Sequence, residues 1–119
     1  MVMKFKFENL IIWQQAMEFG ENIFRLSKQF PKEEPHNLTS QIRRATDSIA
    51  LNISEGSIGQ SNLEHKRFIG MDIRSLAGTV TCLHKALRRK QTSNNEFGEY
   101  YSYAYNLMNM MIGFKKNIR

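Results

Sequence analysis

The chain has 119 residues, a formal net charge of +6 and a single cysteine, Cys82, so it can hold one core but no intrachain disulfide. Its longest apolar run, Leu10 to Trp13, is far shorter than the roughly 20 residues of a membrane span. These features exclude a disulfide-stapled scaffold and a membrane-spanning helix. We expect one cytoplasmic domain over residues 1–119, without a signal peptide and without a membrane partner.

Three breaks divide the chain into four segments in which apolar residues recur at helical spacing. The breaks are "FPKEEPHN" (30–37), "EGSIGQSN" (55–62) and "QTSNNE" (91–96). We therefore predict helices over residues 9–29, 39–55, 62–90 and 95–117. Amphipathic helices joined by short connections favour an all-α, up-down-up-down four-helix bundle.

The first predicted helix (9–29) carries two adjacent apolar stripes. We expect the main core stripe to be Leu10, Trp13, Met17, Gly20 and Phe24. In this stripe Trp13 is interpreted as a core anchor rather than as a residue that stacks on a ligand. The stripe beside it contains Ile12, Phe19, Ile23, Leu26 and Phe30. This helix is therefore expected to bury more than one face.

The second predicted helix (39–55) has an apolar stripe flanked by a polar band. We expect an N-cap at Asn37 or Thr39 and a C-terminal stop at Gly56. The apolar stripe is Ile42, Ala45, Ile49 and Ile53. The polar band, which has Leu51 at its edge, is Gln41, Arg44, Ser48, Asn52 and Glu55. We expect this band to set the register of the helix or the joint between subunits.

The adjacent arginines of this helix point about 100° apart on the helical wheel. Arg44 joins the polar band and is interpreted as a structural residue. Arg43 faces elsewhere, can pair with Asp47 one turn later, and is interpreted as a surface residue.

The third and fourth predicted helices (62–90 and 95–117) each carry a long apolar seam, and Ser61 with Glu64 resembles a capping box before the third. The seam of the third is Ile69, Ile73, Leu76, Val80, Leu83 and Leu87, and that of the fourth is Tyr100, Ala104, Leu107, Met111, Phe114 and Ile118. Further apolar residues widen both faces beyond the arc that one bundle needs. This width predicts a homo-oligomer; the alternative is deep burial within the monomer.

Positive charge is concentrated in the middle of the chain. Residues 37–90 contain nine basic and four acidic side chains, a net +5. On the third predicted helix a basic stripe opposite the seam contains Arg67, Arg74, Lys85 and Arg88. Such a stripe could follow a phosphate backbone, and Arg43 is a further candidate contact. The alternative is an ordinary solvated face, and no aromatic residue of this helix interleaves with the stripe to stack on bases.

No pattern predicts an enzyme, so we expect no catalytic residues, no cofactor and no metal. The one Glu-x-x-His pair, Glu33 and His36, lies in the proline-containing break and has no second copy. Cys82 lies on an apolar face, where a packed and inert thiol is the better interpretation.

Three stretches resemble a known family: "LIIWQQAMEF" (10–19), "FPKEEPHNLTSQIRRATDSIALNISEG" (30–56) and "EHKRFI" (64–69). They are similar to the proteins encoded within intervening sequences of bacterial large-subunit ribosomal RNA genes. The most specific match is the pattern F-P-x-x-E-x-x-x-L-x-x-Q-x-R-R-A-x-x-S-I-x-x-N-I-x-E-G, which this chain follows from Phe30 to Gly56.

The resemblance implies a four-helix bundle that assembles as a homopentamer with a central channel and has no established enzymatic activity. A similar architecture occurs in the accessory protein of diversity-generating retroelements, a basic pentamer thought to bind nucleic acid and a reverse transcriptase. Fold alone does not fix function. Our main hypothesis is a non-enzymatic oligomer that binds RNA or DNA without strong sequence preference. The alternative is a structural or interaction protein whose pentamer docks a protein partner and binds no nucleic acid.

Overall fold

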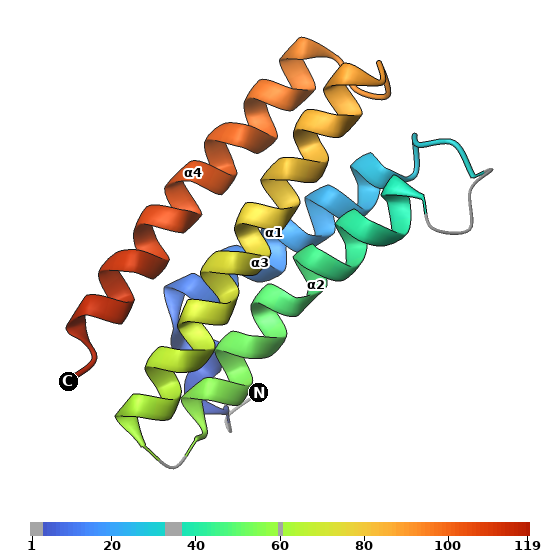
Figure 1. Cartoon of the computed structure of the whole chain (residues 1–119). Coiled ribbons are helices and arrows are strands. Elements are labelled where there is room, and N and C mark those ends of the chain that lie inside the picture. Colours follow the sequence, from blue (N-terminus) through green and yellow to red (C-terminus); the bar gives the residue numbers. More distant parts are fainter. Residues whose placement is uncertain (1–3, 33–36, 60) are drawn as a thin grey trace.

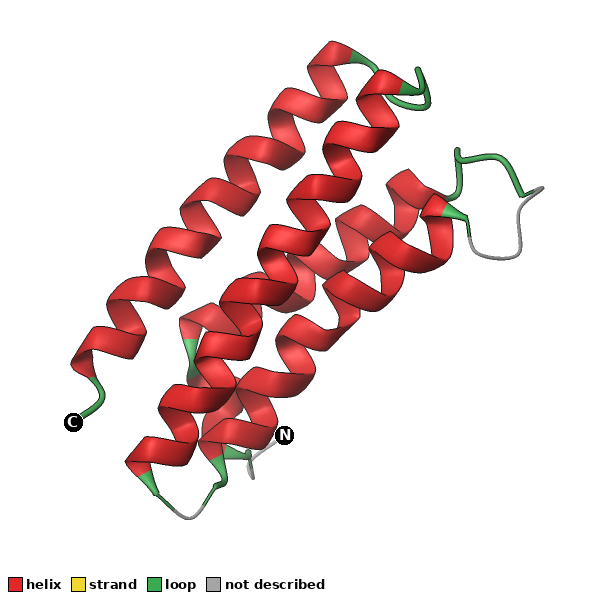
Figure 2. Ribbon diagram, in the orientation of Figure 1, coloured by secondary structure: helices red, strands yellow, loops and turns green. Residues whose placement is uncertain are grey.

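The computed structural model describes residues 4–32, 37–59 and 61–119. This part of the chain is all-α and contains no strand (Figure 2). The elements, labelled in Figure 1, are the short 3₁₀-helix η1 (Lys6–Asn9) and the helices α1 (Ile11–Ser27), α2 (Leu38–Ser57), α3 (Asn62–Arg88) and α4 (Asn94–Asn117). The four helices predicted from the sequence are confirmed, while the Glu33–His36 pair, Pro35 and Gln60 lie outside the described residues.

Consecutive helices run in opposite directions along the bundle (Figure 1). α2 contacts α1 on one side and α3 on the other, α4 packs against α3, and α1 also contacts α4. η1 packs on α1 and α2 and, within the described part of the chain, does not contact α3 or α4. None of the described helices has the length and apolar composition needed to cross a lipid bilayer.

Side-chain caps fix where three of the helices begin. Asn37, one of the two predicted caps of α2, accepts a 3.0 Å hydrogen bond from the backbone N–H of Ser40. Ser61 accepts a 3.1 Å hydrogen bond from the backbone N–H of Glu64, and Ser93 accepts one of the same length from Glu96. These oxygens satisfy backbone donors that the first turn of a helix leaves without partners.

Gly56 does not stop α2, as the sequence had suggested, because the helix continues to Ser57 and Gly56 lies buried inside it. A Cβ placed at Gly56 would lie 2.5 Å from the Cβ of Phe68 on α3. None of the described glycines has a positive φ. Gly56 is therefore needed for its small size and not for a left-handed backbone. Gly56 therefore allows α2 and α3 to approach each other near the turn that joins them.

The core uses the second apolar stripe of α1, which corrects the expected order of the two stripes. Fully or almost fully buried residues on α1 are Ile12, Ala16, Phe19, Ile23 and Leu26. In contrast, Met17 and Phe24 of the expected main stripe remain 44% and 40% exposed. Trp13 is partly buried at the edge of the core, where its ring makes an edge contact with Phe7.

The seams of the other helices contribute their expected residues to this core. Ile42, Ile49 and Ile53 of α2 have no exposed surface. On α3 and α4 the buried seam residues are Ile69, Leu76, Leu83, Ala104, Leu107 and Met111. The alternate seam residues of α3, Ile73 and Val80, are only partly buried and face a groove between α3 and α4.

Candidate functional site

The basic groove is an open hollow between α3 and α4 with a volume of about 570 Å³. It is lined by Lys66, Arg67, Gly70, Met71, Ile73, Arg74 and Lys115. Four of these seven residues are cations, and none is acidic. The ammonium group of Lys115 reaches from α4 toward α3, since a Cβ at Gly70 would lie 3.4 Å from its Nζ. The fold thus adds positive charge from α4 to a cluster on α3.

The structure brings together two of the five basic residues singled out from the sequence. Arg67 and Arg74 line the basic groove with exposed side chains, two turns apart on α3. Lys85 and Arg88 are also exposed, but lie in the last turns of the same helix. The contributions of Lys66 and Lys115 were missed because neither residue falls on the predicted stripe.

Arg43 lies elsewhere and contacts α1, which corrects its interpretation as a surface residue paired with Asp47. Its Nε donates a 2.7 Å hydrogen bond to the hydroxyl of Ser27. Its guanidinium carbon lies 4.5 Å from the centre of the Phe24 ring, a cation–π arrangement. Arg44, expected to be the structural member of the pair, is exposed.

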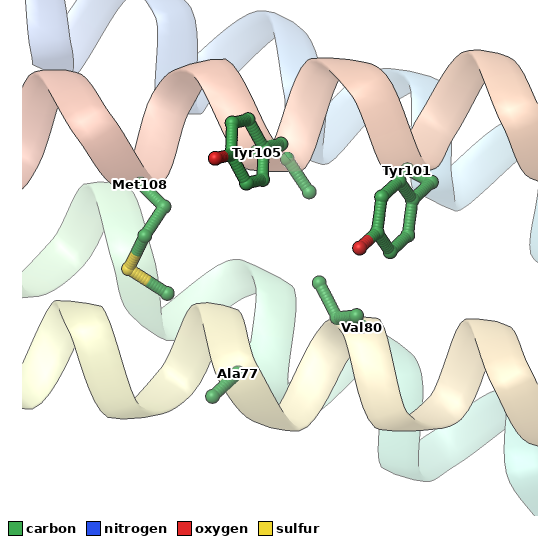
Figure 3. A pocket seen from close by; sticks show the side chains of 6 residues that line it. Ala77, Val80, Tyr101, Tyr105 and Met108 are labelled. Carbon is green, nitrogen blue, oxygen red and sulfur yellow. The ribbon is translucent and has the colours of Figure 1, made fainter.

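An apolar section lies farther along the same two helices, toward the turn that joins them. It has a volume of about 250 Å³ and is lined by Ala77, Val80, Tyr101, Ala104, Tyr105 and Met108. Figure 3 shows the ring of Tyr101 extending from α4 toward Val80 of α3, and the ring of Tyr105 lying alongside α4. Tyr105 is 61% exposed and Tyr101 is 40% exposed. Large aromatic rings are thus available to solvent next to the basic groove.

Three further aromatic contacts extend this section toward the α3–α4 turn. The ring of His84 lies 4.9 Å from that of Phe97 and 6.1 Å from that of Tyr101, centre to centre. Phe97 and Tyr101 are 5.6 Å apart. Lys85 follows His84 directly in the chain, and Arg88 lies one turn beyond it on α3. Cations therefore lie at both ends of the aromatic section.

The predicted polar band of α2 divides into an inner and an outer part. The hydroxyls of Ser48 and Ser75 share a 2.7 Å hydrogen bond across the α2–α3 interface. A second pair in this interface, Thr46 and Thr79, is buried with 3.0 Å between the hydroxyl oxygens. Asn52 also faces α3. The outer members, which are exposed, are Gln41, Arg44, Leu51 and Glu55.

Asp72 is the most unusual polar residue in the core and was not singled out from the sequence. It is 0% exposed, and burial raises the pKa of its carboxyl group to about 8. The Asn52 amide lowers this pKa in part, although neither carboxylate oxygen accepts a hydrogen bond of ordinary geometry from the described residues. Its spacing of three residues from Ile69 and four from Leu76, at the edge of the predicted seam, was the signal that could have identified it.

His65 lies one turn before the core seam begins and packs against α4. Its ring makes an edge contact with Phe114 at 5.4 Å, and burial lowers its pKa. Within the described residues, no group of three or more histidines, cysteines or acidic residues is arranged to hold a metal ion. Cys82 is 6% exposed, and burial raises the pKa of its thiol, which disfavours the reactive thiolate.

A second groove lies on the other side of the bundle, between α1, α2 and η1. It has a volume of about 440 Å³, and its apolar lining includes Phe7, Trp13, Met17 and Leu51. Leu51, which sits beside the polar band, is 59% exposed. This α1–α2 groove also contains the carboxylates of Glu21 and Asp47, whereas all the charged residues that line the basic groove are cations.

Comparisons with known proteins agree with this architecture. The family model for the 23S rRNA-intervening sequence protein matches residues 8–113. A solved structure with a similar fold is a protein of unknown function from the S23 ribosomal protein family of Bacteroides thetaiotaomicron. The two chains are 19% identical, the TM-score is 0.82, and the match covers 90% of this chain and 100% of that one. The search of curated proteins gave no match.

Proposed function

The chain belongs to the 23S rRNA-intervening sequence protein family, and we propose that it is a non-enzymatic, oligomeric helical bundle that binds RNA or DNA through its basic groove. Binding would lack strong sequence preference. The observation that carries this proposal is the convergence of Lys66, Arg67, Arg74 and Lys115 on one groove that no carboxylate lines. Four cations without local counter-charges attract an anionic polymer.

The chemistry of the groove favours contacts to phosphates. Lysine and arginine side chains bind phosphate oxygens by charge-assisted hydrogen bonds, and these contacts position a nucleic acid without reading its sequence. The flexible ends of Arg67 and Arg74 are exposed, so they can adapt to a backbone of irregular path. Affinity should therefore fall steeply as salt is added, because each contact releases bound counterions.

The test is binding of labelled RNA and DNA of mixed sequence, measured by fluorescence anisotropy between about 50 and 200 mM salt. The double variant Arg67→Glu with Arg74→Glu should weaken binding and reduce the slope of log affinity against log salt by about 1.5–2, for two lost contacts. Absence of binding by the folded wild type at the lowest salt would reject the proposal.

A matched control removes the same charge away from the groove. Lys4→Glu with Lys6→Glu changes two exposed lysines at η1, which contacts α1 and α2. This control should bind nearly as well as the wild type and keep most of its salt dependence. Equal weakening by both double variants would show that net charge, and not the groove, governs binding.

We further propose that the subunits assemble through the α1–α2 groove into the homopentamer that the family resemblance implies. Supporting this, Met17 and Leu51 expose apolar surface there, which a monomer gains nothing by leaving in water. A groove that differs from the surface it meets gives a head-to-tail contact, and such contacts form a ring when the rotation from one subunit to the next closes. The single, buried cysteine is compatible with a reducing cytoplasm.

The second candidate is an interaction protein whose oligomer docks a protein partner and binds no nucleic acid. In this alternative the α1–α2 groove holds the partner and not a neighbouring subunit, because exposed apolar surface beside the carboxylates of Glu21 and Asp47 suits a protein surface better than a phosphate backbone. Co-purification of one defined protein that survives nuclease treatment would support this alternative. Loss of the co-purifying material on nuclease treatment would support the first.

A further inference from the structure

The basic groove and the apolar section beside it together form what we call the α3–α4 groove. We propose that this groove binds single-stranded nucleic acid, with phosphates on its cations and bases stacked on Tyr101 and Tyr105. This inference rests on the proposed function and adds the form of nucleic acid that the site selects. Proteins that hold single strands without reading sequence combine a cationic path for the backbone with aromatic faces for the bases. The α3–α4 groove has both components.

The basic and aromatic sections lie one after the other along the same faces of α3 and α4. On α3 the lining residues Gly70, Ile73, Ala77 and Val80 are spaced by three or four, which places them on one face of the helix. On α4 the spacing from Tyr101 through Met108 to Lys115 is seven at each step, again a single face. A ligand lying along this face would meet both sections in turn.

The length and order of the groove fit a short stretch of a single strand. The helix rise places Arg67 about 20 Å from Val80, the length of roughly six nucleotides stacked at about 3.4 Å each. One end of this path carries Arg67, Arg74 and Lys115, and the other end leads to Lys85 and Arg88. The aromatic section lies between them, so bases could stack on its rings while the phosphates on either side contact the cations.

A duplex cannot use this section in the same way, because its bases are paired and stacked inside the helix. Tyr105 is 61% exposed, so its ring is open to a base that is not held in a duplex stack. No carboxylate lines either section, so the lining itself carries no negative charge that would repel a phosphate backbone. The exposed tyrosines therefore make the groove selective for single strands.

The experiment compares three labelled probes at one low salt concentration: a short single strand, a duplex of the same sequence, and a single strand whose nucleotides lack their bases. The wild type should bind the single strand most tightly. Tyr105→Ala and Tyr101→Ala should each weaken binding of that strand by roughly tenfold and leave the abasic strand unchanged. Tyr105→Phe should keep the affinity, because the ring face is retained.

Phe5→Ala is the matched control, since Phe5 is a 67% exposed aromatic residue at η1, away from the groove. It should bind every probe as the wild type does. Equal binding of single strand and duplex, with no effect of Tyr105→Ala, would overturn this inference and leave the proposed function standing. Failure of the wild type to bind any probe would reject both, and dissociation of the oligomer by Tyr105→Ala would assign the ring to a subunit contact instead.

Discussion

Asp72 of α3, which has no surface exposed to solvent, lies beside the partly buried Asn52 of α2. The carboxyl group is therefore more easily protonated in the folded protein than in the unfolded chain, where its pKa is close to 3.9. Asn52 offsets this effect only in part, and neither carboxylate oxygen accepts a hydrogen bond of ordinary geometry from the described residues. This pair makes the stability of the α2–α3 interface depend on pH.

Ionisation of the Asp72 carboxyl group should lower the free energy of unfolding as pH rises. Its folded pKa, about 8, exceeds the unfolded value, so the folded state binds the extra proton and the stabilisation is lost as pH rises toward about 8. His65 has the opposite shift, but the proton that its unfolded form still binds near pH 6.5 offsets no more than about half of this slope, and less as pH rises. Between pH 6.5 and 8 the free energy of unfolding should fall by about 1–2 kcal/mol, measured by urea denaturation.

Asp72→Asn is the variant that isolates this effect. It keeps the shape of the side chain and removes the ionisation, so its stability should be nearly constant over the same pH range. Asn52→Ala should move the pH dependence of the wild type upward, because Asn52 lowers the Asp72 pKa. An unchanged pH dependence in Asp72→Asn would show that another group is responsible.

The sequence predicted the type and order of the four helices because their seams repeat with a strong helical period. It ranked the stripes of α1 wrongly, since Met17 and Phe19 lie on adjacent apolar stripes and periodicity alone cannot tell which faces the core. From the sequence, Gly56 was expected to end the second helix, because glycine often follows the last turn of a helix. The close contact with Phe68 that requires this glycine joins two helices and leaves no periodic signal.

The candidate site was only partly predictable for a similar reason. Arg67 and Arg74 lie on one helix, so their shared face follows from their spacing. Lys115, Tyr101 and Tyr105 join them only because α4 packs beside α3. The sequence indicated that aromatic residues are missing from the basic stripe, which is true of α3 but not of the groove that the two helices form.

Gly56→Ala should destabilise the protein by about 1–3 kcal/mol, because the new methyl group would lie 2.5 Å from the Cβ of Phe68 and the helices must separate. Gly113→Ala is the matched control within α4, where nothing lies within 4 Å of the added Cβ. There the higher helix propensity of alanine should stabilise by about 0.5–1 kcal/mol. Thermal unfolding of both variants measures the contrast, and equal effects would show that Gly56 is not a packing residue.

The adjacent arginines of α2 should differ in their contribution to stability. Arg43→Ala removes the hydrogen bond to Ser27 and the contact with the Phe24 ring, and should cost about 1–3 kcal/mol. Arg44→Ala alters an exposed side chain and should change stability by less than about 0.5 kcal/mol. Urea denaturation of the two variants gives the comparison. A larger cost at Arg44 would restore the sequence-based interpretation that Arg44 is the structural residue.

Leu51→Glu should dissociate the proposed oligomer. Leu51 exposes 59% of its surface in the α1–α2 groove, so a charge there costs the monomer little but would be buried without a partner in a subunit interface. Light scattering at micromolar concentration should show a wild-type mass several times the 13.9 kDa of one chain and a lower mass for the variant. Leu63→Glu, at a 72% exposed position in the first turn of α3, is the control and should leave the assembly intact. A wild type that scatters as one 13.9 kDa chain would rule out the assembly at that concentration, because no subunit contact would then cover the groove.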